Sequence, residues 1–227
     1  MAATGVLTAT SYAILGLLAI KPWTTYELAK QMDRTLNRFW PRARSKLYEE
    51  PKKLVAEGLA TATPGVHGRR PRTVYSITPR GRQALAEWLA ADSAPPVFES
   101  EHLLKVFYAD SGSTENLLNT LARLRAWVHE RSLHNIRVAT SYLEGAGPYP
   151  ERYPILVLTG RFLDDQLEMI DRWASWATEV VSTWPAEPKK ATPDAAAMAV
   201  TARQAADRAN RWTAGSGSDS NAAAAKR

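Results

Sequence analysis

The beginning of the chain combines helical patterns with the residues that start and stop helices. Apolar residues recur every three or four positions over residues 10–20, which predicts a first helix. Pro22 ends it, because the residue before a proline disfavours the helical region. Thr24 and Glu27 have the spacing of a capping box, in which each side chain satisfies a free backbone donor of the other. A second helix is therefore expected over residues 25–37.

The third predicted helix is basic and contains a proline. It covers residues 43–57, and Gly58 is expected to end it in the left-handed conformation. Pro51 lies inside this pattern and has no backbone N–H to donate. The helix is therefore expected either to bend at Pro51 or to begin later than residue 43.

A hairpin pattern follows this helix. Residues 59–63 and 73–77 predict two short strands, of which the second alternates apolar and polar positions. Pro64-Gly65 and His67-Gly68 predict the turn between them. Pro79 stands at the first position of a fourth helix, where its missing N–H costs nothing. A helix followed by a basic hairpin is typical of a winged helix, whose helix enters the DNA major groove while the hairpin lies along the backbone.

The second half of the chain is helical throughout. Beyond Pro95-Pro96 a helical pattern starts at Glu99, and a second one covers residues 113–143. A loop rich in Gly, Pro and Tyr separates it from a long helix over residues 153–183. Apolar residues form a two-sided stripe on this last helix, which is typical of a coiled-coil seam or a subunit interface.

The predicted fold class is mainly α. An N-terminal winged helix-turn-helix of α+β type is followed by an all-α dimerisation domain, and the tail is Ala-rich and mostly disordered. Within the tail, residues 194–212 are expected to form at most a fraying helix, and residues 215–227 none. The three predicted regions are residues 1–93, 97–185 and 186–227.

Charge separates the same three regions. The net charge of the 227 residues is +6. Residues 1–91 contain 14 Lys and Arg against 6 Asp and Glu, residues 92–185 contain 8 against 13, and residues 186–227 contain 7 against 4. The basic first region is expected to meet a polyanion, and the acidic middle is not.

Composition excludes several classes of protein. The chain has no Cys, which excludes disulfides, thiolate catalysis and Cys-based zinc sites. No stretch approaches the roughly 20 apolar residues of a transmembrane helix, and no signal peptide is recognisable, so a cytoplasmic protein is expected. The histidines His102, His129 and His134 have neither a nucleophile nor metal-ligand spacing beside them. No enzyme activity, metal or cofactor is therefore predicted.

Basic and polar residues on the third helix and the hairpin are the candidate DNA contacts. Arg and Lys can donate to guanine in the major groove, whereas Arg at a hairpin tip suits phosphates or a narrow minor groove. The alternative is a solvated surface helix with pairs such as Glu49 with Lys53. The candidate contacts are Arg42, Arg44, Ser45, Lys46, Tyr48, Lys52, Lys53, Arg69, Arg70 and Arg72.

Large apolar residues in the second region suggest two further roles. Of the 8 tryptophans, Trp127, Trp173 and Trp176 are candidates for holding a flat aromatic effector, although Trp is also a good core and interface residue. The residues expected at a dimer interface are Leu103, Leu104, Phe107, Leu158, Phe162, Ile170, Trp173 and Ala177.

Four segments together carry a family resemblance. SYAILGLLAIKPWTTYELAKQM, FWPRARSKLYEEPKKLVAEGLA and GRRPRTVYSITPRGRQAL resemble the PadR family of bacterial transcriptional regulators, and PPVFESEHLLKVFYAD extends the likeness to its long-form members. The resemblance implies a homodimer that binds a palindromic operator in double-stranded DNA. It also implies that the protein is usually a repressor, which a small-molecule effector releases from DNA.

The resemblance assigns DNA contacts and also shows a departure. Ser45, Lys46, Tyr48 and Lys53 match the family's helix contacts, and Arg69, Arg70 and Arg72 match its wing contacts. Many members have proline directly after the tyrosine, where this chain has Glu49. Two other functions stay open, namely a sequence-indifferent architectural DNA-binding protein and a ligand-sequestering protein whose DNA contact is incidental.

Overall fold

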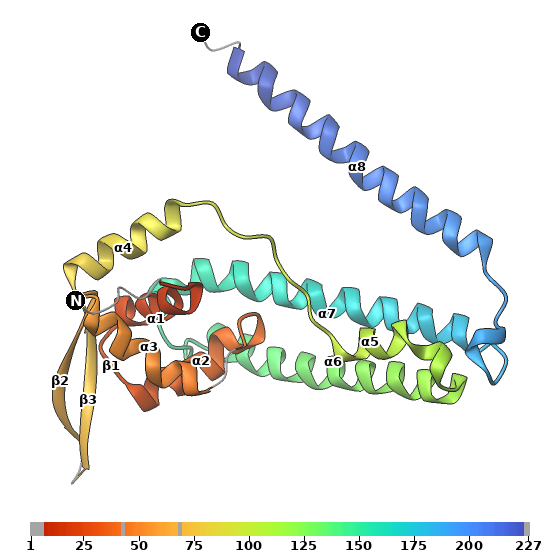
Figure 1. The fold of residues 1–227 in the computed structure, drawn as a ribbon. Helices are drawn as coiled ribbons and strands as arrows, with labels where there is room; N and C mark the ends of the chain where they lie inside the picture. The colour runs from red at the N-terminus through yellow and green to blue at the C-terminus, as the bar shows by residue number, and fades with distance from the viewer. Residues whose placement is uncertain (1–6, 42–43, 68–69, 225–227) are drawn as a thin grey trace. The chain divides into compact units, whose positions relative to one another are not determined.

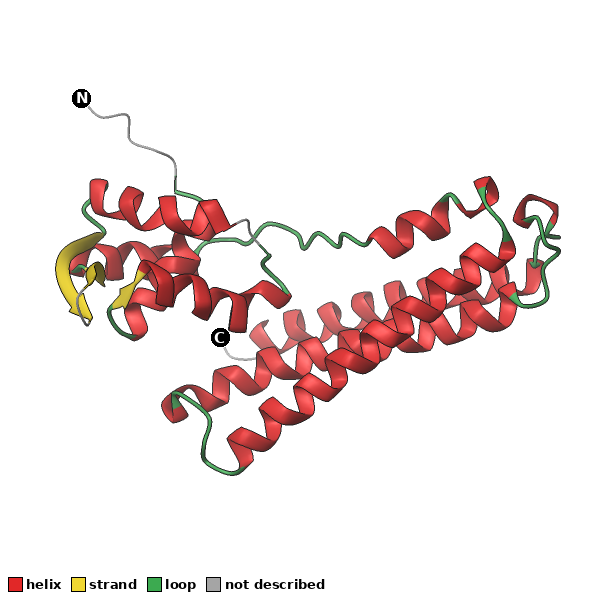
Figure 2. Ribbon diagram, turned by 90° about the horizontal axis from the view of Figure 1, so that it is seen from below, coloured by secondary structure: helices red, strands yellow, loops and turns green. Residues whose placement is uncertain are grey.

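The computed structural model describes the backbone of residues 7–41, 44–67 and 70–224, and within these the side chains of all but residues 44–46, 66–67, 70–71 and 212–224. The chain divides into two compact units, Met1–Val97 and Phe98–Arg227. Unit 1 combines helices with a small sheet, and unit 2 is helical (Figures 1 and 2). The expected fold class, a winged helix-turn-helix followed by an all-α region, is confirmed.

In the described residues of unit 1 there are four α-helices and three antiparallel strands, which pair in the order β1-β3-β2. Its elements are α1 (Ala9–Ile20), β1 (Trp23–Thr24), α2 (Thr25–Thr35), α3 (Arg44–Ala56), β2 (Ala60–His67), β3 (Arg70–Ile77) and α4 (Pro79–Ala90), with a short 3-10 turn, η1 (Leu36–Arg38).

Local sequence signals begin and end these helices as expected. The Thr24 hydroxyl accepts from the Glu27 N–H, and the Glu27 carboxylate accepts from the Thr24 N–H at 2.8 Å, so the predicted capping box is confirmed. Gly58 ends α3 with φ of +69°, and Pro79 opens α4. Because α3 already includes Arg44 and runs through Pro51, the alternative of a later start is wrong.

The core of unit 1 lies between α1, α2, α3 and the sheet. Trp23 is buried at one end of it, where its indole N–H donates to the Leu17 carbonyl at 2.8 Å. Apolar side chains from all three helices are almost fully buried in this core: Ile14, Leu15, Leu18, Leu28, Met32, Leu47 and Leu54.

The β2–β3 hairpin is longer than the sequence predicted. Its ladder continues through Pro64↔Thr73 and Gly65↔Arg72 to His67↔Arg70, so Pro64-Gly65 belongs to a strand rather than to the turn. Pro64 is tolerated because β2 is an edge strand, on which a missing N–H can face solvent. The strand β1 was not predicted, because two residues are too few to show an alternating pattern.

Unit 2 is organised around two long helices that lie side by side, α6 and α7 (Figures 1 and 2). Its elements are α5 (Glu101–Phe107), η2 (Ala109–Ser111), α6 (Thr114–Leu143), η3 (Pro150–Arg152), α7 (Tyr153–Val181), η4 (Pro188–Lys190) and α8 (Ala195–Ala224). The predicted bounds of α6 and α7 agree with these to within two residues.

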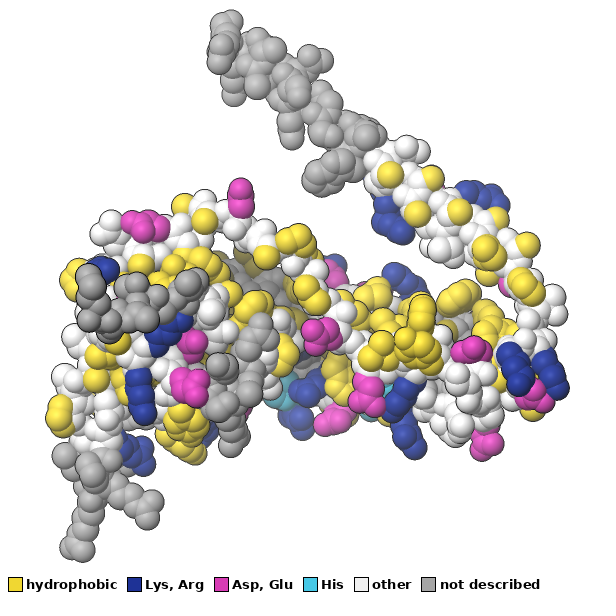
Figure 3. Space-filling view, viewed as in Figure 1, with side chains coloured by type: hydrophobic (Ala, Val, Ile, Leu, Met, Phe, Trp, Pro, Cys, Tyr) yellow, Lys and Arg dark blue, Asp and Glu magenta, His cyan; other side chains and the backbone are white. Residues whose placement is uncertain are grey.

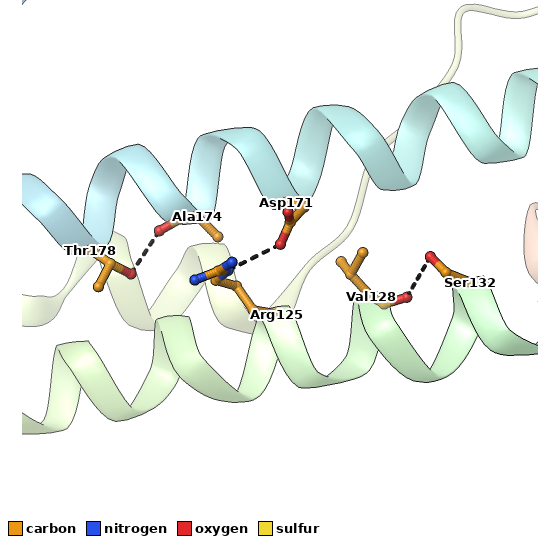
Figure 4. Close-up of polar contacts among 6 residues, drawn as sticks. All are labelled: Arg125, Val128, Ser132, Asp171, Ala174 and Thr178. Atoms are coloured by element: carbon orange, nitrogen blue, oxygen red, sulfur yellow. Dashed lines mark hydrogen bonds and ion pairs between the residues drawn. The ribbon is translucent and has the colours of Figure 1, made fainter.

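The clustered buried core of the α6–α7 pair occupies part of its length. Two groups of buried apolar residues join the first half of α6 to the second half of α7, so the two helices run antiparallel: Leu124, Val128, Leu167, Ile170 and Ala174 in one, Leu117, Leu121, Ala177 and Val181 in the other. Beside this core an ion pair of 3.0 Å joins Arg125 on α6 to Asp171 on α7 (Figure 4).

Helix α8 extends into the segment that was expected to be disordered. The sequence predicted at most a fraying helix to residue 212 and no order from residue 215, whereas α8 continues to Ala224. Alanine has the highest helix propensity, which accounts for the helix over the alanine-rich start of α8 but not for its continuation through residues 215–221, GSGSDSN. Among the described residues, no helix is both long and apolar enough to cross a membrane.

Candidate DNA-binding surface

Helix α3 packs one side against the core of unit 1 and exposes another side to solvent. Leu47 and Leu54 bury the inner side in the core of unit 1, at 2% and 0% exposed. On the outer side Tyr48 is 46% exposed, and Lys52, one helical turn further, is also exposed. Residues four apart lie on the same face of a helix. A phenol and an ammonium group are thus presented together to solvent.

The structure places the other predicted α3 contacts along the same helix. Lys53 is half-buried. Arg44, Ser45 and Lys46 form the first turn of α3, the part of a recognition helix that usually reaches base edges. Arg42 lies outside the described residues.

The hairpin adds further basic residues to unit 1. Arg70 pairs with His67, and Arg72 pairs with Gly65, while Arg69 lies outside the described residues. Gly65 is required by close packing, because a Cβ there would approach the Val74 Cγ2 to 2.7 Å. Figure 3 shows Lys and Arg side chains near the hairpin, in agreement with the basic charge of residues 1–91.

Sequence reasoning missed Lys21 as part of this basic surface. The pKa of Glu27 is lowered chiefly by the Thr24 N–H and hydroxyl, and the positive charges of Lys21 and Arg72 lower it further. Both cations therefore lie near the same carboxylate. Thr24 pairs with Val74 across β1 and β3, and this pairing brings Arg72 of β3 within electrostatic range of Glu27. No local pattern in the sequence could have shown it.

Arg82 is a second basic residue beyond the predicted contacts. It is exposed at the start of α4, and its guanidinium donates to the Ala19 carbonyl at the end of α1, at 3.5 Å. Arg80, two residues earlier in the chain, is also exposed. The start of α4 thus adds positive charge to the same unit.

The predicted dimer residues separate into two groups. Five are exposed on α5 and α7: Leu103, Leu104, Phe107, Leu158 and Phe162. Ile170 and Ala177 are each 7% exposed and lie in the α6–α7 core, against which Trp173 also packs. These three lie on the side of the α7 stripe that α6 covers, so the five exposed residues are the better candidates for a dimer interface.

The predicted effector tryptophans lie outside the two cavities described below for unit 2. Trp173 packs against the α6–α7 core, Trp176 is 48% exposed, and Trp127 is 39% exposed with the Arg131 guanidinium 5.9 Å from its ring centre. Unit 2 has an open cavity of about 480 Å³ by α5 and the start of α6, and another of about 670 Å³ between α6 and α7. Among the described residues, no tryptophan lines either cavity.

The cavity of about 480 Å³ has mainly apolar walls. Leu104, Tyr108 and Leu117 line it, together with Lys105 and Asn116. The cavity of about 670 Å³ is polar, with Arg125, His129, Asp164, Glu168 and Asp171 in its walls. Within the described part of the chain, no three His, Asp or Glu residues are placed to bind one metal ion.

Comparison with known proteins agrees with this geometry. Residues 14–87 match the transcriptional regulator PadR-like family. The negative transcriptional regulator PadR of Bacillus subtilis is 32% identical over 99 residues, which cover 43% of this chain and 54% of that protein. The probable transcriptional regulator Rv1176c of Mycobacterium tuberculosis is 33% identical over 85 residues, 37% of this chain and 45% of that protein. The chain thus spans about half the length of the curated relatives it matches.

Solved structures share the fold over a longer stretch. Bacillus subtilis PadR in complex with operator DNA has a TM-score of 0.62 at 24% identity, covering 77% of this chain and 99% of that one. The structure of the same protein in complex with p-coumaric acid has a TM-score of 0.56 at 24% identity, again covering 77% of this chain and 99% of that one. The virulence activator AphA of Vibrio cholerae gives 0.54 at 26% identity, covering 77% of this chain and 96% of that one.

Fold and surface together define a winged helix-turn-helix protein with a basic helix and wing. Residues 14–87 of this protein match the PadR-like family of transcriptional regulators. This family and the relatives named above are described as regulators of transcription rather than as enzymes.

Proposed function

We propose that this protein is a sequence-specific, DNA-binding regulator of transcription. The observation that carries the proposal is the outer side of α3, where Tyr48 and Lys52 are exposed, in a unit whose hairpin also carries arginines. The shared fold with Bacillus subtilis PadR, which has been solved with operator DNA, supports it. The first turn of α3 would read base edges in the major groove, and the wing would follow the phosphates.

Each predicted contact has a role that its chemistry suits. Arg44 and Lys46 can donate to guanine O6 and N7, and Ser45 can serve either kind of base. Tyr48, Lys52 and Lys53 suit phosphate or sugar contacts, as do Arg42 and the wing arginines Arg69, Arg70 and Arg72. Phosphate contacts supply affinity and register, while the first turn of α3 supplies sequence preference.

The protein is proposed to act as a homodimer through unit 2. Leu104, Phe107, Leu158 and Phe162 are between 60% and 77% exposed, and Figure 3 shows hydrophobic side chains gathered on the surface over α5. Exposed apolar patches of this kind mark protein interfaces. Two heads related by a twofold axis would bind half-sites about one DNA turn apart, so the operator would be palindromic.

A small effector is proposed to release the protein from DNA, which would make it a repressor. Bacillus subtilis PadR, a negative regulator, has been solved with p-coumaric acid. The cavity of about 480 Å³ beside α5 is a better candidate site than the tryptophans, because Leu104, Tyr108 and Leu117 give it apolar walls and Lys105 offers a cation for a carboxylate. A ligand there would touch the exposed helix α5 and could change how two copies associate.

The decisive experiment is a gel shift with the DNA just upstream of the protein's own gene. A scrambled duplex of equal length serves as the control, and p-coumaric acid is then titrated into the bound complex. Tight binding with a strong preference for the upstream DNA supports specific regulation. Equal binding to both duplexes, followed by a search of random sequences that selects no site, would favour an architectural protein and overturn the proposal. Micromolar binding of p-coumaric acid without any DNA affinity would favour ligand sequestration.

A further inference from the structure

Glu50 is a carboxylate on α3 that faces the start of α1 instead of solvent. It is 8% exposed, and its Oε2 accepts a hydrogen bond of 2.6 Å from the hydroxyl of Ser11, which is fully buried. A buried carboxylate is costly unless hydrogen bonds compensate it. The neighbouring Glu49, by contrast, is exposed. The contact with Ser11 therefore constrains where this turn of α3 can lie.

The directions of the hydrogen bonds around Ser11 can be assigned. A serine hydroxyl has one hydrogen, and here it is donated to Glu50. The contact of 3.3 Å between the Thr8 and Ser11 hydroxyls must then use the Thr8 hydrogen, and the Thr8 N–H also donates to Ser11 Oγ at 3.0 Å. Glu50 is thus the last acceptor of a short network that belongs to the first turn of α1. Its negative charge also lies at the helix end where the dipole of α1 favours it.

Pro51 makes α3 weakest at this turn. Because it has no N–H, it cannot donate to the Leu47 carbonyl, so one bond of the helical ladder between the two halves of α3 is absent. The Pro51 side chain itself is fully buried. The first half of α3 therefore depends more than usual on side-chain contacts for its direction, and the Ser11–Glu50 bond adjoins the interruption.

The same turn of α1 also holds the segment that precedes α3. The Trp40 indole N–H donates to the Thr10 hydroxyl at 3.2 Å, and Thr10 is 7% exposed. Residues of α1 thus form hydrogen bonds with one residue before the segment 44–46 in the chain and with one residue after it. From these contacts we infer that Glu50 is a positioning residue, whose bond to Ser11 aims the first half of α3 at the DNA bases. The inference rests on the proposed DNA-binding function.

A pair of variants separates position from charge. Glu50→Ala removes both the carboxylate charge and the acceptor for Ser11, whereas Glu50→Gln removes the same charge but keeps an acceptor oxygen. For Glu50→Ala we expect about a tenfold loss of operator affinity, the usual effect of breaking one buried hydrogen bond to a charged group. Affinity for random DNA should change less than about twofold, because it rests on phosphate contacts. For Glu50→Gln, the affinity for the operator and the affinity for random DNA should both stay within about twofold of the wild-type values.

Thr78→Ala is the matched control for loss of stability in unit 1. Thr78 caps α4, accepting from the Gly81 N–H at 3.0 Å and donating to the Gly58 carbonyl at 2.8 Å, and it takes no part in the network of Ser11 and Glu50. Urea unfolding of all variants gives the stability scale. An equal loss of operator preference in Thr78→Ala, or an equal loss in Glu50→Gln, would overturn the positioning role.

Hydrogen exchange of the full chain without DNA gives an independent measurement. In Glu50→Ala the backbone amides of the first half of α3 should exchange about tenfold faster than in wild type, with those after Pro51 less affected, and Glu50→Gln should resemble wild type. Unchanged exchange in Glu50→Ala would refute the inference. A wild-type protein without preference for any DNA sequence would instead refute the proposed function, while the exchange rates would still decide what Glu50 does.

Discussion

The two units of the chain use their apolar residues in different ways. In unit 1, helices α1, α2 and α3 and the sheet surround one core, and the outer side of α3 is polar and basic. In unit 2, the α6–α7 core covers only the half near α5, and Phe107, Leu158 and Phe162 are between 65% and 77% exposed. The first unit encloses its core within one chain, while the second exposes apolar surface that a partner would cover.

Geometry explains this difference. Helices and a sheet that meet from several directions can each bury an apolar face against the others. Two long helices side by side bury one stripe each, and a helix that is apolar on two sides keeps the second side open. Helix α7 has such a second side, which carries Leu158 and Phe162. We therefore expect the stability of unit 1 to depend mainly on its own core, and that of unit 2 to depend also on association with a second copy.

The largest effects should come from cavities in the two cores. Leu54→Ala in unit 1 and Leu121→Ala in unit 2 each remove a side chain that is 0% exposed, and each should lower the free energy of unfolding by about 2–5 kcal/mol. Urea unfolding followed by circular dichroism measures it. Leu89→Ala, at a leucine that is 69% exposed, is the control and should change little. Similar losses in all three variants would contradict the burial that distinguishes them.

The second prediction concerns the exposed side of α7. Changing Leu158 and Phe162 together to Ser should weaken dimerisation at least about tenfold, because large apolar residues dominate interface energies. Sedimentation at a series of protein concentrations measures the dimer constant. Leu89→Ser removes an equally exposed leucine from unit 1 and should leave the dimer intact. Wild-type chains that remain monomeric at all concentrations would show that unit 2 needs no second copy.

The basic residues of unit 1 provide the third prediction. Lys46→Ala and Arg70→Ala should each weaken operator binding and reduce the slope of log affinity against log salt by about one. Lys105→Ala removes the same charge from unit 2, where Lys105 pairs with Glu101 at 2.7 Å, and should leave the slope unchanged. Gel shifts at several salt concentrations give these slopes. Equal slopes for all four proteins would refute the contact assignment.

The smallest effect should come from the capping box of α2. The Thr24 N–H and hydroxyl, and then the charges of Lys21 and Arg72, hold the pKa of Glu27 below its ordinary value of 4.5. A lowered carboxyl pKa stabilises the fold above that ordinary value, and the contribution is lost as pH falls through the folded pKa. Glu27→Gln should therefore cost about 0.3–1 kcal/mol at neutral pH, the usual worth of a carboxylate at a helix start, and progressively less below pH 4.5.

Urea unfolding from pH 7 to pH 3 measures this difference. Glu101→Gln is the comparison in unit 2, where a hydrogen bond from Lys105 lowers the pKa of Glu101 at a fully exposed site. Solvent screens such a pair, so its removal should have less effect than that of Glu27. A stability difference for Glu27→Gln that is constant with pH would show that its carboxylate is not stabilised by folding.

Much of the fold was predictable because its signals are local. Thr24, Gly58, Thr78 and Ser113 begin or end helices through contacts with residues three positions away, so their effect can be read along the chain. The period of apolar residues likewise predicted α6 and α7. The basic helix and hairpin that make up the candidate site were also predictable, since charge and element order are properties of the sequence.

What the sequence alone determined is therefore most of the helices, the hairpin, the basic character of unit 1 and the likeness of residues 14–87 to the PadR-like family. Only the tertiary structure decided which side of α7 is buried, why Ile170 and Ala177 belong to the core, and how the charges of both Lys21 and Arg72 come to act on Glu27. It also showed that Glu50 bonds to Ser11, 39 residues away. These outcomes depend on which faces of distant elements meet, and periodicity along one element contains no information about its partner.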